Sequence, residues 1–316
     1  MGTSLHRGRF APSPTGELHL GNAWAALLGW LWARAEGGAF LLRIEDLDRA
    51  RLRPGAVETL LADLDWLGLD FDEPPAIQSE RTALHDRALE TLRAQGRVYP
   101  CFCSRTEVAR AASAPHGPAD DGPLYPGTCA TLDEAARGAR ASARPPAWRF
   151  RPTPGVTRVN DLLRGAVLQD VAAAVGDFVV RRNDGVASYQ LAVVVDDAAS
   201  GITHVLRGED LLGSTPRQLQ LGCALGLPTP RYAHVPLLLG PDGKRLAKRA
   251  GPPSLAELRR AGVPGARVVG LLARWATLGD GDPVEPVALV PAFSLDRLPR
   301  QPVSVDPEQV RQALLD

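Results

Sequence analysis

The feature that most restricts the fold is at the N-terminal end, where a short strand, a tight loop and an apolar helix follow one another. The predicted strand covers Gly8–Ala11, and the loop after it is rich in Pro and Gly. Residues 20–35 are apolar on nearly every side, as expected of a helix packed on a sheet. This arrangement brings unpaired backbone N–H groups and the positive end of a helix dipole to one place, where they can bind an anion.

Strands and helices continue to alternate along the chain. Phe40–Ile44 is predicted to be a buried strand, and Gly55–Gly68 an amphipathic helix with Pro54 near its first position. A helix is expected over residues 215–225 and a strand over 231–240. Three short Val-rich or Leu-rich runs are predicted to be strands buried on both faces: Asp177–Val180, Tyr189–Val195 and Ile202–Leu206. The alternation predicts an α/β fold with a parallel sheet.

Two regions depart from this alternation. From about residue 100 to 176 the sequence is rich in Pro, Gly, Ala and Arg and has few long apolar runs, which indicates an insertion. After Pro252, three short helical patterns are joined by Pro-rich linkers: Ser254–Ala261, Gly265–Leu278 and Pro307–Leu314. We therefore expect one large domain over residues 1–249, interrupted at about 100–176, and a small helical region over 250–316.

Composition limits the possible partners. With 45% hydrophobic residues, 316 residues are enough to bury a sizeable core. Basic and acidic residues number 36 each, so a nucleic acid would have to be attracted by a local patch. No stretch approaches the roughly 20 apolar residues that a membrane span needs. We expect a cytoplasmic protein without a membrane partner.

The basic residues are distributed unevenly. Only Lys244 and Lys248 are lysines, so the other 34 of the 36 basic residues are arginines. Both lysines follow the turn at residues 241–243, and a compact ammonium differs from a planar guanidinium in what it can bind. This segment could close over a triphosphate and neutralise charge developing at the α-phosphate. The alternatives are a solvated basic turn and chance placement.

A second candidate for phosphate binding is the start of the first helix. His19 could donate a hydrogen bond to a phosphate there, and Gly21 would let a nucleotide approach the backbone. On its own this pattern is weak, because a His near a helix start is more often structural.

Three of the four cysteines fall close together. Cys101, Cys103 and Cys129 lie in polar, turn-forming sequence, which favours a metal over disulfides. Three thiolates suit a tetrahedral, structural zinc ion and leave one ligand open. His116 is the chemically ordinary candidate for the fourth ligand. Cys223 lies on an apolar helix and is expected to be in the core.

Several segments together resemble a known family, the class I glutamyl-tRNA synthetases. The resemblance spans residues 7–250, and its motifs occur in the family's order: Arg9–Gly16, His19–Asn22, Arg43–Asp48, Val194–Asp197 and Arg207–Asp210. It implies a Rossmann-type catalytic domain with an inserted zinc-containing subdomain, in which Tyr125 is the fourth zinc ligand. It also implies binding of ATP, with Mg²⁺, by His19, Gly21, Asn22 and Lys248, of which His19 and Lys248 act in catalysis. Where the family has Lys-Met-Ser-Lys-Ser, this chain has residues 245–249, in which Ala247 lacks a hydroxyl and Lys248 is kept.

The amino-acid pocket can also be inferred from chemistry. Free glutamate carries an ammonium and two carboxylates, so its pocket needs an acidic group and at least one guanidinium. The resemblance implies that Arg9 and Arg207 hold the carboxylates and Glu45 the ammonium. It implies that the rest of the pocket consists of Phe10, Ala11, Pro12, Ser13 and Tyr189. Without the resemblance, Glu45 and Asp48 would be interpreted as a solvated strand end.

The number of residues after the lysine segment indicates which branch of the family the chain resembles. Residues 250–316 are too few for the anticodon-binding domain of full-length glutamyl-tRNA synthetases. The chain instead resembles a truncated branch of the family, the glutamyl-queuosine tRNA(Asp) synthetases, and Val193 stands where the longer enzymes tend to have Asn. This implies a monomer that activates glutamate without tRNA and transfers it to the queuosine base at the wobble position of tRNA(Asp). The alternatives are a minimal glutamyl-tRNA synthetase and a catalytically silent binding protein.

Overall fold

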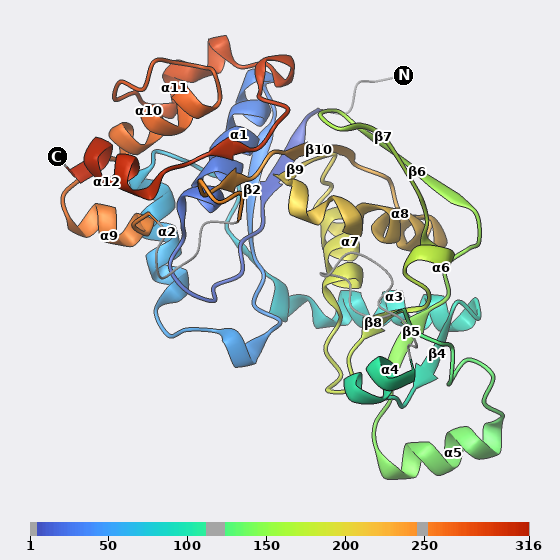
Figure 1. Ribbon diagram of the computed structural model, residues 1–316. Helices are drawn as coiled ribbons and strands as arrows, with labels where there is room; N and C mark the ends of the chain where they lie inside the picture. The colour runs from blue at the N-terminus through green and yellow to red at the C-terminus, as the bar shows by residue number, and fades with distance from the viewer. Residues whose placement is uncertain (1–4, 112–123, 245–251, 316) are drawn as a thin grey trace.

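The computed structural model describes residues 5–111, 124–244 and 252–315 (Figure 1). Three parallel strands form the first sheet in chain order: β1 (Arg7–Phe10), β2 (Ala39–Ile44) and β3 (Ala76–Ile77). β1 and β2 are buried except at their first residues, as expected of parallel strands covered by helices, whereas β3 at the edge is half-buried.

Four strands form a second sheet in the order β7-β6-β10-β9: β6 (Val156–Asp161), β7 (Gly165–Asp170), β9 (His204–Gly208) and β10 (Arg231–Val235). β9, β10 and β6 are parallel, whereas β7 pairs with β6 as an antiparallel hairpin. The two sheets meet where the Arg7 N–H donates to Thr203 Oγ1 and the Thr203 N–H donates to the Arg7 carbonyl, both at 2.9 Å. The predicted α/β fold with a parallel sheet is confirmed.

A separate antiparallel sheet forms within residues 98–181. Its strands are β4 (Val98–Cys101), β5 (Ala147–Phe150) and β8 (Phe178–Arg181), in that order. The strand predicted at Asp177–Val180 therefore exists as β8, but in an antiparallel sheet. Figure 1 shows this sheet beside α4 (Arg105–Ala111), with α5 (Glu134–Ala143) projecting beyond it.

Helix α1 (Leu20–Ala35) is at the centre of the largest apolar core, and its Trp24 indole donates to the Pro236 carbonyl at 3.1 Å. The C-terminal helices share this core. They are α9 (Leu255–Arg260), α10 (Gly265–Trp275), α11 (Pro286–Leu289) and α12 (Pro307–Leu315). The short strands β11 (Leu238–Leu239) and β12 (Val303–Ser304) pair in parallel and tie this region to the rest of the chain. No helix in the described ranges is long and apolar enough to cross a membrane.

Residues 189–195, predicted to be a strand, are instead the start of helix α7 (Tyr189–Ala199). Their many Val residues favour a strand by propensity, but packing decides otherwise. Leu191 and Val195, one helical turn apart, are buried in a cluster with residues of two further helices. Those helices are α3 (Thr82–Ala94) and α8 (Thr215–Ala224).

The strand predicted over residues 231–240 is also interrupted. β10 ends at Val235, and Pro236, which has no N–H to donate to a ladder, separates it from β11. The helices predicted at 55–68, 215–225, 254–261, 265–278 and 307–314 are present, with α2 (Ala56–Trp66) as the first of them.

Two buried histidines stack at the end of the sheet where β1 and β9 begin. The rings of His6 and His204 lie 4.0 Å apart and nearly parallel, and both pack edge-on against Trp32. His6 Nδ1 lies 3.0 Å from Glu36 Oε2. Burial lowers the pKa of both imidazoles, that of His204 to about 4. The folded protein therefore keeps His204 neutral at pH values where the unfolded chain protonates it.

We expect the free energy of unfolding to fall as the pH decreases from about 6.5 to about 4, because the unfolded state binds the proton first. His204→Phe keeps the ring packing and removes this contribution, so it should reduce the pH slope by up to about 1.4 kcal/mol per pH unit. Denaturant titrations at pH 7, 6 and 5 measure the slope. An unchanged slope in the variant would contradict this account.

Candidate active site

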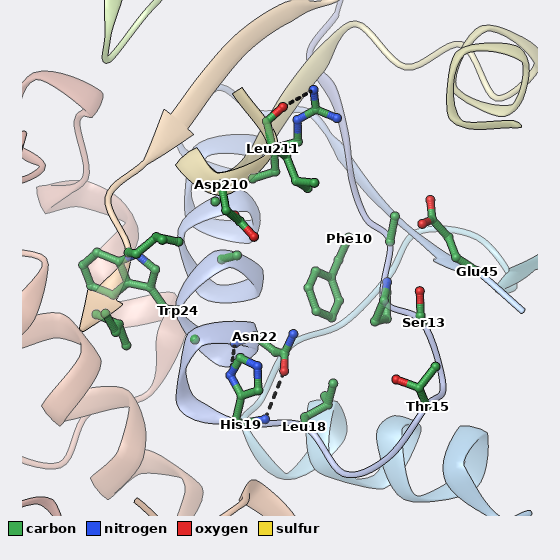
Figure 2. Close-up of a pocket in the computed structure, with 18 of the residues that line it drawn as sticks. Phe10, Ser13, Thr15, Leu18, His19, Asn22, Trp24, Glu45, Asp210 and Leu211 are labelled. Carbon is green, nitrogen blue, oxygen red and sulfur yellow. Dashed lines mark hydrogen bonds between the residues drawn. The ribbon is translucent and has the colours of Figure 1, made fainter. Parts of the chain in front are cut away.

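A cavity of about 610 Å³ opens at the carboxyl ends of β1 and β9, beside the start of α1 (Figure 2). Every described residue that the sequence predicted for ATP or glutamate lines it: Arg9, Phe10, Ala11, Pro12, Ser13, His19, Gly21, Asn22, Glu45, Tyr189 and Arg207. The carboxyl ends of parallel strands are where α/β folds bind ligands. Lys248 lies outside the described residues.

His19 is the N-cap of α1, at one end of the cavity. Its Nδ1 accepts from the Asn22 N–H at 3.3 Å, and Asn22 Oδ1 accepts from the His19 N–H at 3.0 Å, as Figure 2 shows. A Cβ on Gly21 would come within 3.0 Å of the His19 ring, so a side chain there would displace the imidazole. The first turn of α1 holds no acidic residue, so no side chain of that turn offsets the positive end of the helix dipole.

Buried charges lie at the other end of the cavity. Asp197, on α7, accepts from Arg9 Nε at 3.2 Å and from Arg43 Nη1 at 2.5 Å. Arg43 Nη2 also donates to Glu45 Oε1 at 3.0 Å. Burial alone would raise the pKa of Asp197, but Arg9 and Arg43 together lower it. Burial raises the pKa of Glu45. An additional cation beside Glu45 would therefore favour its ionised form.

Arg207 is held by neutral groups alone among the described residues. Its Nε donates to His234 Nε2 at 3.0 Å and its Nη1 to the Tyr189 hydroxyl at 3.2 Å. Nη2 donates to Thr215 Oγ1 at 2.9 Å and to Gln218 Oε1 at 2.8 Å. A buried guanidinium without a carboxylate partner attracts an anion from the cavity.

His234 holds Arg207 only when it is neutral. Its Nδ1 lies 2.6 Å from Asp161 Oδ2, so this nitrogen carries the proton and Nε2 accepts from Arg207. Burial lowers the pKa of His234 to about 4; contact with Asp161 opposes this shift, and Arg207 and Arg9 add to it. Protonation would place a second cation against Arg207.

The three clustered cysteines converge, as predicted. Their sulfur atoms all lie within 4.8 Å of one another, with Cys103 Sγ and Cys129 Sγ 3.6 Å apart. Zn–S bonds of about 2.3 Å in a tetrahedron imply sulfur separations of about 3.8 Å. The Tyr125 hydroxyl lies 3.4 Å from Cys101 Sγ and 3.6 Å from Cys103 Sγ, at the fourth corner. The residues therefore fit a zinc ion, and His116, the other candidate ligand, lies outside the described residues.

The surroundings of this cluster also suit a metal with thiolate ligands. Arg149 Nε lies 3.3 Å from Cys101 Sγ and Arg140 Nη1 lies 3.7 Å from Cys129 Sγ. Burial would raise the pKa of Cys129, but donors that include the Phe102 N–H lower it, whereas burial raises the pKa of Cys103 to about 11. Cys223 is exposed, contrary to its predicted place in the core, because the face of α8 that it occupies is opposite the face that packs on α7.

Comparison with known proteins agrees with this geometry. Residues 6–281 match the family model for the catalytic domain of class I tRNA synthetases (E and Q). The glutamyl-Q tRNA(Asp) synthetase of Symbiobacterium thermophilum is 54% identical over 96% of this chain and 97% of its own length. The protein of the same name from Nocardia farcinica is 50% identical over 93% of this chain and 91% of its own length. The chain belongs to the glutamyl-Q tRNA(Asp) synthetases.

A solved structure supports the same assignment. A glutamate tRNA ligase from Elizabethkingia meningosepticum, determined in complex with its amino acid, matches 98% of this chain and 69% of its own. Its TM-score is 0.83 at 28% identity. As a glutamyl-Q tRNA(Asp) synthetase, the chain is a ligase with a class I synthetase fold.

Some residues of the site had no predicted role. Arg43 and Asp197 lie within two of the segments that carry the family resemblance, but the contact between them was not predicted. His234 and Asp161 were not singled out at all. The available signal was a polar residue at the apolar side of each of two strands, His234 beside Val235 in β10 and Asp161 two residues after Val159 in β6. A buried polar side chain in such a strand needs a partner.

Removal of a cysteine ligand tests the metal site. We expect the purified protein to hold one zinc ion per chain, and Cys101→Ser to lose it because a tetrahedral site with one ligand missing binds zinc far more weakly. Inductively coupled plasma mass spectrometry measures the metal content. Cys223→Ser is the matched control and should keep the ion. Full zinc content in the Cys101 variant would show that the site is wrong.

The contact between His234 and Arg207 predicts a pH effect on glutamate binding. His234→Phe removes the acceptor for a buried guanidinium, and we expect the Kd for L-glutamate to rise about tenfold. In the unaltered protein the Kd should rise as the pH falls from about 6 towards 4, because His234 becomes protonated. Calorimetric titrations measure both effects. His204→Phe, the same change at a buried site far from the cavity, should leave the Kd at pH 7 unchanged; equal effects of both variants would contradict the proposed contact.

Proposed function

We propose that this protein activates L-glutamate with ATP, without tRNA, and transfers it to the queuosine base at the wobble position of tRNA(Asp). The observation that supports this most directly is a cavity that joins a helix N-terminus to two buried arginines, Arg9 and Arg207, and to the carboxylate of Glu45. The proposed acceptor rests on the names of relatives that match this chain over nearly all of its length and theirs.

The pocket offers groups of both signs for glutamate. Arg9 and Arg207 are buried guanidiniums that line the cavity, and the carboxylate of Glu45 lies on its wall. Arg207 would hold a carboxylate through the remaining N–H of Nη1, Arg9 would hold the other, and Glu45 would receive the ammonium.

ATP would occupy the His19 end of the same cavity. The backbone N–H groups at the start of α1, together with His19 and Asn22, would bind phosphate, and Gly21 leaves space for the nucleotide. The nucleotide would enter as its Mg²⁺ complex. Lys248, outside the described residues, is proposed to neutralise charge at the α-phosphate.

The reaction then needs positioning more than covalent help from the protein. A glutamate carboxylate oxygen attacks the α-phosphorus of ATP, pyrophosphate leaves, and glutamyl-adenylate remains in the pocket. In the second step a hydroxyl of the queuosine cyclopentene ring attacks the carbonyl carbon. An ester bond forms, the hydroxyl proton is lost and AMP leaves. Holding the reactants in line and stabilising the developing charge account for the rate increase in both steps.

A second candidate acceptor is the 3′ end of tRNA(Glu). The similarity of the fold to a glutamate tRNA ligase favours it. The chain covers only 69% of that protein, whereas it covers 97% of the Symbiobacterium relative. We therefore prefer the queuosine acceptor.

Transfer of labelled glutamate decides between the acceptors. The protein is incubated with ATP, Mg²⁺ and labelled L-glutamate, and with one of three RNAs: tRNA(Asp) with queuosine, tRNA(Asp) with guanosine at that position, or tRNA(Glu). We expect label on the queuosine-bearing tRNA(Asp) alone. Label on tRNA(Glu) would identify a minimal glutamyl-tRNA synthetase. Label on none of them, with no glutamate-dependent exchange of pyrophosphate into ATP, would identify a silent binding protein.

A further inference from the structure

A second, larger cavity of about 940 Å³ lies next to the first. Ser13, Glu45 and Tyr189 line both cavities, so the two share a wall at the proposed glutamate end. The far side of the second cavity is formed by the antiparallel sheet and the cysteine cluster, including Cys101 and Tyr125. It lies on the side of the glutamate pocket away from His19, so a group bound there would approach glutamate without meeting ATP.

Most charged side chains that line the second cavity are already engaged. Asp177 accepts from the Tyr99 hydroxyl at 2.6 Å, and its carbonyl accepts from Arg149 at 2.7 Å. Arg144 donates to Glu107 at 2.9 Å. These contacts hold the walls in place and reduce the capacity of these groups to bind a ligand.

Asp48 differs from these groups. It follows β2 at the end of the Arg43–Asp48 segment and precedes the short 3₁₀ turn η1 (Arg49–Arg51), and it is half-buried. Its carboxylate makes no hydrogen bond or ion pair with any residue that the structure describes, and it does not cap η1. A half-buried carboxylate in this position favours a cationic ligand.

We propose that the second cavity binds the queuosine nucleoside and that Asp48 receives its ammonium group. This inference rests on the proposed function. Queuosine carries a secondary amine, protonated at neutral pH, between its 7-deazaguanine base and its cyclopentenediol ring. With that ammonium at Asp48, the ring and its hydroxyls would lie towards the shared wall, where the glutamyl carbonyl is expected. The cavity volume falls within the range of small-ligand sites, which is about 300 to 1,000 Å³.

The charge of Asp48 would also let the protein distinguish queuosine from guanosine at the wobble position. Unmodified guanosine at the wobble position has neither the ammonium nor the acceptor hydroxyls. A carboxylate left without its cation in a half-buried site would disfavour guanosine relative to queuosine. The carboxylate would also repel the phosphates of the anticodon loop, so that the base, rather than the backbone, enters the cavity.

Competition experiments test this assignment. Two nucleosides are compared as inhibitors of glutamate transfer to queuosine-bearing tRNA(Asp): 7-aminomethyl-7-deazaguanosine, which is cationic, and neutral 7-deazaguanosine. We expect the cationic nucleoside to inhibit at a concentration at least tenfold lower. In Asp48→Asn this difference should disappear, and the KM for the tRNA should rise about tenfold, because one ion pair is lost. Asp65→Asn, at an exposed carboxylate on α2, is the matched control and should keep the preference of the unaltered protein.

The outcomes separate this inference from the proposed function. If the unaltered protein transfers glutamate to none of the RNAs, the proposed function fails. If transfer occurs but Asp48→Asn keeps the tenfold preference for the cationic nucleoside, the assignment of Asp48 is overturned. The Kd for L-glutamate reports whether the variant pocket is intact. If Asp48→Asn proves misfolded, Asp48→Glu decides: it should retain the preference, and its loss there would overturn the assignment.

Discussion

The site depends on one buried carboxylate, that of Asp197. It joins α7 to the first sheet by accepting hydrogen bonds from Arg9 on β1 and Arg43 on β2. Replacing it by a neutral group would leave two buried guanidiniums facing each other, which costs several kcal/mol in comparable cases, about 3 to 5. Arg43 also donates to Glu45. By positioning Arg43, Asp197 therefore determines where the carboxylate of Glu45 lies in the pocket.

The sequence predicted the parts of this site better than their connections. The motif residues do gather around one cavity, because the loop after β1, the start of α1 and the end of β9 all lie at one edge of the parallel strands. Residues 189–195 were wrongly predicted to be a strand, since their β-branched residues dominate any local measure of propensity. Asp197 contacts Arg9, which lies 188 positions earlier in the chain. Arg207 contacts Thr215 because α8 packs beside the end of β9. Local sequence patterns contain neither of these contacts.

The arrangement of the two cavities suits a reaction with two steps. Tyr189, at the start of α7, lines both cavities, and its hydroxyl contacts Arg207. Helix α7, whose first residues were predicted from the sequence to be a strand, therefore connects the amino-acid pocket, the second cavity and the apolar cluster behind them.

The close contact between the end of α2 and the start of α10 has a consequence for chimeric proteins. The Trp66 indole donates to the Val263 carbonyl, and a Cβ on Gly265 would come within 1.8 Å of the Trp66 carbonyl oxygen. Backbone this close at a helix crossing tolerates no change in the relative position of the two segments. A crossover between homologous genes placed just after the lysine segment would exchange one side of this contact without the other. Recombinants that take α2 and α10 from the same parent should therefore fold better than those that take them from different parents.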